Sequence, residues 1–389
     1  MTSPICLLAT ELLEHIAGHL NPEDILALRL TCRDAEEKIF HFFCCQFFGY
    51  LRTDLSRSSL ARINALSKHK QLKQYVQGME VNLGTGLGRD IVWERHSWGP
   101  LASPLLVEEI QNLKNTLLYD LVNCRSFFIF CRYPEGRLDL NRMTITDAVA
   151  IFFAVISESL LPLKAFSLAY CTNQACSLLM DMRRLPPLLH RQPGFLSAWW
   201  HLKELSIDQY LTQESFPFFC ELVLSAPNLH SLSLNLSFHD LSAGLIHELA
   251  SSKSFPSLRQ LKLSRSFVQA NDLKSLLRRL SGSLRELVLQ YISFTSDDAW
   301  DSIFEEIKSD LLVLQSISLG FLRVNTSACR TLTFPALETE PFTTSLLAKN
   351  CELAYLDDKS LSLAVGVKYS GPRLSDILEL LHMAGIHTR

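Results

Sequence analysis

The sequence predicts an α/β fold in two parts: a small all-α module at the N-terminus, then a curved solenoid of stacked strand–helix units. Three observations lead to this prediction. The apolar template L-x-x-L-x-L recurs at near-regular intervals from Cys124 onward, helical apolar spacing fills the intervals between copies, and residues 8–33 have helical spacing without the template. A chain of 389 residues is long enough for both parts.

The repeats are the strongest pattern in the chain. The last five copies begin at residues 202, 229, 258, 284 and 314, at intervals of 27, 29, 26 and 30 residues. One copy is a weak indication because Leu is common, but a near-regular series predicts one strand and one helix per repeat. The clear copies are Leu163-Phe166-Leu168, Leu202-Leu205-Ile207, Leu229-Leu232-Leu234, Leu258-Leu261-Leu263, Leu284-Leu287-Leu289 and Leu314-Ile317-Leu319, after a degenerate copy at Cys124-Phe127-Ile129.

Alternation within each strand separates core from surface. It sends Leu205 and Ile207 inward and turns the residues between them outward. No repeat covers its apolar face alone, so the repeats share one core, and the stack curves with its more closely spaced strands on the concave side. This organisation resembles a leucine-rich-repeat array of the long, helix-bearing class. By the same parity, we expect Tyr170, Tyr291 and Phe321 to point into the core.

The N-terminal stretch predicts two short helices. Residues 8–20 place four apolar side chains at helical spacing. The second helix has Asn21 as its N-cap, Pro22 at its first position and two acids in its first turn, where they suit the positive end of the helix dipole. A unit this small carries more apolar surface than it can bury alone, so we expect it to dock on a partner.

This stretch resembles the F-box, whose pattern runs Leu-Pro, Glu-x-Leu-x-x-Ile-x-x-x-Leu, then Asp-Leu-x-x-Leu-x-x-Val-Cys-Arg. The chain departs from it at Ala9, which replaces Pro, at Thr31, which replaces Val, and in lacking a Trp after Cys32-Arg33. A plain helical cap is the alternative interpretation. The matching residues are Glu11, Leu13, Ile16, Leu20, Asp24-Ile25, Leu28 and Cys32-Arg33.

The F-box resemblance implies a Skp-type adaptor and, through it, a cullin scaffold as partners. Some of the apolar residues must hold the box helices together, and the spacing does not divide these from the contact residues. The candidates for adaptor contact are Leu8, Leu12, Leu13, Ile16, Leu20, Ile25, Leu26 and Leu28.

We expect three segments along the chain: an F-box over 1–46, a connector of helices and loops over 47–120, and the repeat domain over 121–389. In the connector, the apolar spacing of residues 60–66 predicts an amphipathic helix. The connector also resembles the helical segment that many fungal F-box proteins carry between the box and the repeats.

The C-terminal residues predict a cap for the solenoid. Leu363, Val365 and Val367 alternate like a strand, Gly371-Pro372 marks a turn, and helical spacing follows up to Gly385. Repeat arrays need such a cap because their last apolar face is otherwise open to water.

Charge and cysteine usage exclude several classes of protein. Lys and Arg number 37 against 40 Asp and Glu, a net charge of −3, so no basic field indicates a nucleic-acid partner. Eleven scattered cysteines without a C-x-x-C pair favour a reducing, cytoplasmic or nuclear compartment. The longest apolar run, residues 148–156, is too short to span a bilayer, so we expect a buried helix there and no membrane partner.

The sequence predicts no catalytic residue, no cofactor site and no metal site. It contains no H-E-x-x-H, no G-x-S-x-G and no Walker loop. The G-x-G-x-G pattern at residues 84–88 lacks the helix that should follow a phosphate loop, so a plain loop is favoured. His41, Cys44 and Cys45 share a helical face but lack a fourth zinc ligand. We therefore expect a binding protein rather than an enzyme.

The two resemblances together imply a substrate-recruiting subunit of a Skp–cullin–F-box ubiquitin ligase. The box would bind the adaptor, the repeats would bind a target protein, and other subunits would perform the transfer. The chain would then contribute effective concentration and orientation rather than bond making. The alternative is a non-catalytic repeat scaffold that acts outside a cullin ligase.

Two surfaces compete for the target. The outward strand positions form a concave strip that is mostly small and uncharged, whereas loops at the strand ends carry the aromatic and Arg side chains that dominate binding hot spots. We favour the loops, with Arg265, Phe267, Tyr291, Phe321 and Arg323 as the candidate target-binding residues. The competing strip comprises Glu204, Ser206, Asp208, Ser231, Ser233, Asn235, Gln260, Lys262, Ser264, Glu286, Val288, Gln290, Ser316, Ser318 and Gly320.

Overall fold

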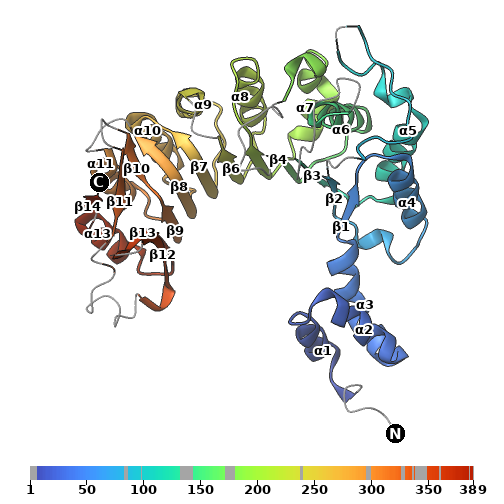
Figure 1. Cartoon of the computed structure of the whole chain (residues 1–389), viewed down its shortest axis with the longest axis horizontal. Helices are drawn as coiled ribbons and strands as arrows, with labels where there is room; N and C mark the ends of the chain where they lie inside the picture. Colours follow the sequence, from blue (N-terminus) through green and yellow to red (C-terminus); the bar gives the residue numbers. More distant parts are fainter. Residues whose placement is uncertain are drawn as a thin grey trace.

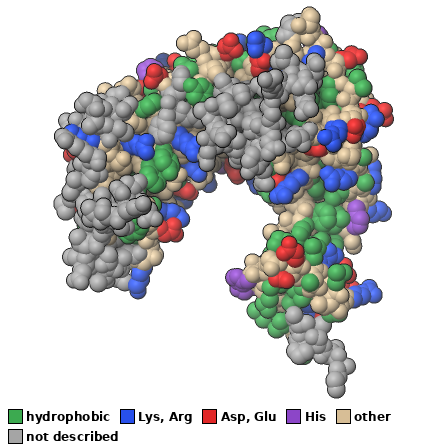
Figure 2. All heavy atoms as spheres, viewed as in Figure 1, with side chains coloured by type: hydrophobic (Ala, Val, Ile, Leu, Met, Phe, Trp, Pro, Cys, Tyr) green, Lys and Arg blue, Asp and Glu red, His purple; other side chains and the backbone are tan. Residues whose placement is uncertain are grey.

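The computed structural model of the chain is an arch whose sheet lines the inner side and whose helices lie along the outer side (Figure 1). Three N-terminal helices extend from one end, and the space-filling view shows the hollow beneath the arch (Figure 2). The structure describes residues 7–388 except 83–85, 98, 132–142, 171–179, 237–239, 295–298, 326–328, 335–336, 338–347, 359–360 and 385.

The N-terminal module contains α1 (Thr10–Ala17), α2 (Pro22–Thr31) and α3 (Arg33–Phe48). The predicted cap of the second helix is confirmed: Asn21 Oδ1 accepts a hydrogen bond from the Asp24 amide at 2.9 Å. The third helix lies beyond the two that the sequence predicts. Apolar side chains of α1 and α2 pack against it, so the module is a small three-helix unit.

Nine parallel strands form the inner wall of the arch, each followed by the next in chain order. The predicted α/β fold with a repeating strand–helix unit is therefore confirmed. The strands are β1 (Tyr50–Thr53), β2 (Gly78–Asn82), β3 (Ser126–Cys131), β4 (Ala165–Tyr170), β5 (Glu204–Asp208), β6 (Ser231–Asn235), β7 (Gln260–Phe267), β8 (Glu286–Phe294) and β9 (Ser316–Gly320).

The helices on the outer side cover the apolar face of this sheet. They are α4 (Arg57–Ser67), α5 (Glu108–Asn115), α6 (Ile145–Ser159), α7 (Pro193–Trp199), α8 (Phe216–Leu224), α9 (Asp240–Ser251), α10 (Ala270–Leu280) and α11 (Ala299–Asp310). Shorter helical turns are η2 (Lys73–Tyr75), η3 (Pro104–Leu106), η4 (Thr116–Asp120), η5 (Met182–Arg184), η6 (Leu189–Arg191) and η8 (Ala348–Asn350).

Helix α6 carries the longest apolar run of the chain and is buried over most of its length, as predicted. Thr144 caps it: the side chains of Thr144 and Asp147 exchange hydrogen bonds with each other's backbone amides. Arg95 and Arg184 neutralise the buried Asp147 carboxylate at 2.7 and 3.2 Å. Within the described ranges, we find no helix with the length and apolarity needed to cross a membrane.

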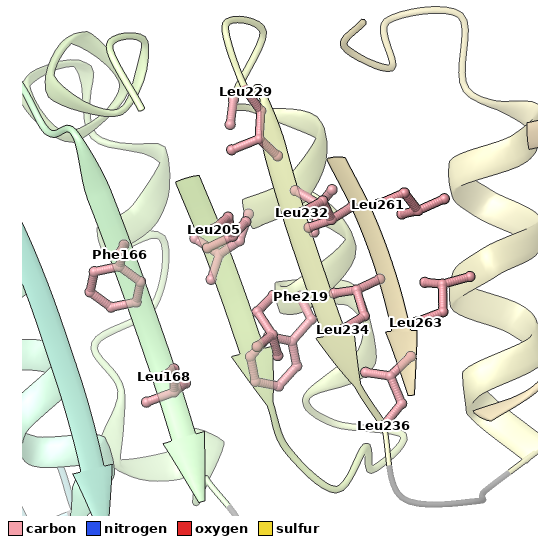
Figure 3. Close-up of a cluster of buried hydrophobic side chains, with 14 of the residues drawn as sticks. Phe166, Leu168, Leu205, Phe219, Leu229, Leu232, Leu234, Leu236, Leu261 and Leu263 are labelled. Carbon is pink, nitrogen blue, oxygen red and sulfur yellow. The ribbon is translucent and has the colours of Figure 1, made fainter. Parts of the chain in front are cut away.

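The core runs continuously from repeat to repeat. Phe166, Leu205, Leu232 and Leu261 occupy equivalent positions on neighbouring strands and point toward the helices (Figure 3). Leu232, Leu261 and the next residue of this row, Leu287, are fully buried, as the template predicts. Each repeat therefore shares its apolar face with its neighbours.

The predicted boundary between connector and repeats needs correction. The helix expected around residues 60–66 is present as α4, but β1 and β2 also lie in the segment 47–120 and continue the parallel sheet. The solenoid thus begins at Tyr50 rather than near residue 121. Its first strands were missed because both depart from the template: in β2, Met79 and Val81 replace leucine, and in β1 the buried residue that follows Leu51 by two is Thr53.

The sheet divides at its C-terminal end. One branch runs from β9 to β13 (Leu361–Ser370) and β12 (Cys351–Asp358), and the other runs from β8 to β10 (Arg323–Asn325), β11 (Cys329–Thr333) and β14 (Ile386–Thr388). Helix α13 (Leu374–Ala384) packs beside α11. The expected strand and closing helix are both present, so the end of the solenoid is covered.

Candidate protein-binding surfaces

An apolar face lies open on the N-terminal module. Leu12, Ile16 and Leu26 are 55%, 40% and 44% exposed, and Leu30 is 88% exposed. Leu12 and Ile16 are four residues apart on α1, as are Leu26 and Leu30 on α2, so each pair shares one side of its helix. Apolar side chains are visible on this module in Figure 2. Such a cluster of exposed aliphatic side chains is typical of a protein-binding surface.

The structure divides the eight predicted contact residues into three groups. Leu13 and Ile25 are buried inside the module and hold its helices together. Leu8, Leu20 and Leu28 are half-buried and pack against the two small clusters that Leu13 and Ile25 form. The remaining three, Leu12, Ile16 and Leu26, are available for contact.

Sequence reasoning missed two exposed residues of this module, Leu7 and Leu30. For Leu30 the signal was present, because it lies one helical turn beyond Leu26 and faces the same way. It falls on a position that the F-box pattern leaves open, so the family motif did not point to it.

A second cluster joins the module to the solenoid. Phe43, Phe47 and Phe48 near the end of α3 pack with Leu72 and Tyr75 of the first repeat. The Arg29 guanidinium stacks over the Phe43 ring at 3.7 Å. These contacts join α3 directly to the first repeat. They therefore set the direction in which the apolar face of the module points relative to the arch.

The concave side of the arch carries a kink that repeats in three successive repeats. Arg265, Tyr291 and Phe321 have φ angles of 49°, 55° and 51°, in the left-handed region that L side chains rarely adopt. The next residue in each repeat turns inward instead. The expectation that Tyr291 and Phe321 point into the core is therefore wrong: both are half-buried. The side chain of Tyr170 lies outside the described residues. The inward residues after the kink are Ser266, Ile292 and Leu322.

The kink brings the five predicted target-binding residues onto one face. Arg265, Tyr291 and Phe321 form one outward row, while Phe267 and Arg323 flank Ser293 in the next outward row. The rings of Tyr291 and Phe321 stack with centroids 4.6 Å apart and an interplanar angle of 1°. Arg265 is exposed and the other four are half-buried, so the group offers aromatic and guanidinium surface to a partner.

Charged groups of the concave strip lie beside this face. Asp208 is half-buried at the end of β5, and burial raises the pKa of its carboxyl to about 6, against the opposing effects of Arg265, Asn235 and Lys262. Asp208, Asn235 and Ser264 are paired across neighbouring strands. The cluster therefore combines the carboxylate of β5 with two cations of β7, two strands away.

The raised pKa of Asp208 predicts a pH-dependent stability. Well below the unfolded pKa of 3.8 the carboxyl is protonated in both folded and unfolded chains and has no effect. As the pH rises to 6 the unfolded chain releases the proton first, so ionisation favours unfolding. Asp208→Asn should thus be more stable than wild type at pH 7, by roughly 1–3 kcal/mol, and equally stable at about pH 3. Urea unfolding at both pH values tests this, and a pH-independent difference would contradict it.

The groups considered for a metal or phosphate do not assemble into a site. Cys45 Sγ lies 3.8 Å from His41 Nε2, but Cys44 is buried, and burial raises the pKa of its thiol to about 11. In the part of the chain that the structure describes, no three His, Cys, Asp or Glu side chains gather as metal ligands. The glycine pattern is described from Gly86, where it forms a turn; residues 83–85 lie outside the described residues.

Known proteins offer little beyond this geometry. No protein-family model matches the chain, and no curated protein matches it. Among solved structures, a Bacteroides fragilis protein determined as a structural-genomics target is similar over 68% of this chain and 74% of its own, with 12% sequence identity and a TM-score of 0.32. A similarity this distant carries no conclusion about what the chain binds.

Proposed function

We propose that this protein is a target-recruiting subunit of a Skp–cullin–F-box ubiquitin ligase. The N-terminal module docks on a Skp-type adaptor, and the inner side of the arch holds a target protein. Other subunits carry out the transfer of ubiquitin, which is accelerated because the target is held nearby. The chain itself is not catalytic in this proposal.

The observation that carries the proposal is the division of apolar residues in the N-terminal module. The interior of the module is filled by Leu13, Ala17 and Ile39. Four further aliphatic residues remain at the surface: Leu12, Ile16, Leu26 and Leu30. Exposed aliphatic side chains in such a small unit require a partner to remove them from water. Ile16 occupies a specified position of the F-box pattern, and the other three lie on the two helices that carry the pattern, which supports a Skp-type adaptor as that partner.

The alternative function is a non-catalytic repeat scaffold that acts outside a cullin ligase. Co-purification separates the two. The tagged full-length chain, captured with its adaptor in mild salt, should retain cullin in the first case and adaptor without cullin, or neither protein, in the second. A chain lacking residues 50–389 is the control for contacts made by the arch.

Target capture should depend on the five predicted target-binding residues beside the kink rather than on the concave strip. We call this group, Arg265, Phe267, Tyr291, Phe321 and Arg323, the kink face. A chain with Phe267, Tyr291 and Phe321 all changed to Ala should lose its target, because aromatic anchors carry most interface energy; a loss of about tenfold or more is expected. The matched chain with Ser233, Lys262 and Gln290 changed to Ala should retain its target.

Thermal unfolding of both chains provides the control, because Tyr291 and Phe321 are half-buried. If only the strip variant loses the target while both chains stay folded, the concave strip is the binding site and the kink face is not.

A further inference from the structure

Six consecutive repeats place a basic residue at the same position. In each case it is the residue immediately before the strand, at the N-terminal rim of the sheet, from β3 to β8. These strands lie side by side along the arch (Figure 1). We call the row the basic ladder; its members are Arg125, Lys164, Lys203, His230, Arg259 and Arg285.

Backbone hydrogen bonds hold the ladder together. The carbonyl of Lys164 accepts bonds from the amides of Lys203 and Glu204, at 2.9 and 3.1 Å, and the same pattern joins each of the other neighbouring rungs. Successive rungs are therefore one strand spacing apart, about 4.8 Å, and the six rungs extend over about 24 Å.

The side chains of the ladder are not held in ion pairs. Within the described ranges, none of the six side chains forms an ion pair. Arg125 Nη1 is buried without a hydrogen-bond partner. Burial and the charges of Lys203 and Arg259 lower the pKa of His230, as expected where like charges stand together. Like charges on adjacent strands destabilise a sheet, and an anionic partner would offset this repulsion.

Exposed apolar side chains flank the first half of the ladder. Val122, Leu160 and Trp200 lie in the loops that lead into β3, β4 and β5, three or four residues before the basic rungs. They are 50%, 57% and 57% exposed. The rim therefore combines a row of cations with aliphatic and aromatic contact surface, as protein-binding interfaces do.

We propose that the basic ladder binds an extended acidic polypeptide segment of the target, with apolar residues of the segment packed on Val122, Leu160 and Trp200. This inference rests on the proposed target-recruiting function and names the chemistry of the target. About seven extended residues match the length of the ladder.

A polypeptide fits this rim better than a nucleic acid. Of the three flanking residues, Val122 and Leu160 offer no ring on which a base can stack and suit aliphatic side chains, and Trp200 alone carries a ring. Glu204 and Glu286 stand in the row next to the ladder and would repel a continuous phosphate backbone. A peptide can place uncharged residues opposite them.

The test uses the full-length chain and a fluorescent 12-residue peptide in which Glu and Asp alternate with Leu and Ser. Fluorescence anisotropy should give saturable binding that weakens steeply with salt. Lys164→Glu with Arg259→Glu should reduce the affinity by about tenfold or more, because both rungs change sign. The matched control is Arg62→Glu with Lys274→Glu, which makes the same charge change on the outer helices α4 and α10 and should alter the affinity by less than about twofold.

Several outcomes would overturn the inference: equal loss in both double variants, equal binding of a peptide with Gln and Asn in place of the acids, or preferential binding of a single-stranded RNA 12-mer. Lys164→Ala with Arg259→Ala, followed by thermal unfolding, should leave the stability unchanged or higher, since repulsion is removed; a marked loss would assign the ladder a structural role. Adaptor capture by the same variants should be intact, so failure of the ladder is distinguishable from failure of the proposed function.

Discussion

Replacing Ile16 with Asp is expected to abolish capture of a Skp-type adaptor while the chain remains folded. Ile16 is 40% exposed, so the free chain can keep the new carboxylate in water. Docking would bury that carboxylate against apolar surface, which costs several kcal/mol and corresponds to a loss of affinity of about a thousandfold or more. Calorimetric titration of the purified chain with the adaptor measures this loss.

Leu312→Asp is the matched control for this variant. Leu312 is 82% exposed in the loop before β9, at the other end of the arch from the N-terminal module. Its replacement should therefore leave the affinity for the adaptor unchanged. Leu13→Asp provides a contrast, because Leu13 is fully buried and its replacement should unfold the module itself. A folded Ile16→Asp chain that binds adaptor like wild type would show that the docking face is elsewhere.

The second large effect concerns the shared core of the solenoid. Leu232→Ala, Leu261→Ala and Leu287→Ala should each reduce the free energy of unfolding by about 2–5 kcal/mol, since each removes a fully buried side chain and leaves a cavity. The loss should extend to adjacent repeats, because each repeat is stabilised by its interfaces with the next. Hydrogen exchange on β5–β8 would report that extension.

Leu312→Ala, at an exposed position, should change the free energy of unfolding by less than about 0.5 kcal/mol in the same urea series. If the three core variants unfold at the same urea concentration as this control, the repeats do not share a core.

The repeat pattern predicted the middle of the fold well for a simple physical reason. A strand whose alternate residues are Leu or Ile can be buried on only one face, so Leu205, Leu232 and Leu261 define both the strands and their register. The second strand obeys the same rule with other residues: Val76, Met79 and Val81 occupy the template positions and are fully buried. A template that admits Val and Met would have placed β2 in the solenoid, but not β1, where the buried Thr53 follows Leu51.

The kink face could not be derived from the template. Parity is certain only while the backbone stays extended, and a left-handed residue shifts the alternation by one position. Arg, Tyr and Phe do not favour a left-handed conformation, so the residue types at 265, 291 and 321 gave no indication that the alternation of side chains would shift there. At Tyr291 the kink coincides with the division of the sheet, where the end of β8 pairs with β10 instead of β9. At Arg265 it is matched by the neighbouring strand, since β7 and β8 stay paired on both sides of the kink. The kinked conformation, which local preference opposes, is thus shared between paired strands.

The N-terminal module shows the same contrast. Helical spacing and the Asn21 cap were sufficient to predict its first two helices, because both depend on residues within one or two turns. Which leucines face the interior depends on where α3 lies, and Ile39 and Phe43 of that helix cover Leu13 and Ile25 but leave Leu12, Ile16 and Leu26 open. Local apolar spacing therefore decides where helices and strands form, whereas the packing of distant segments decides which of their residues remain free to bind a partner.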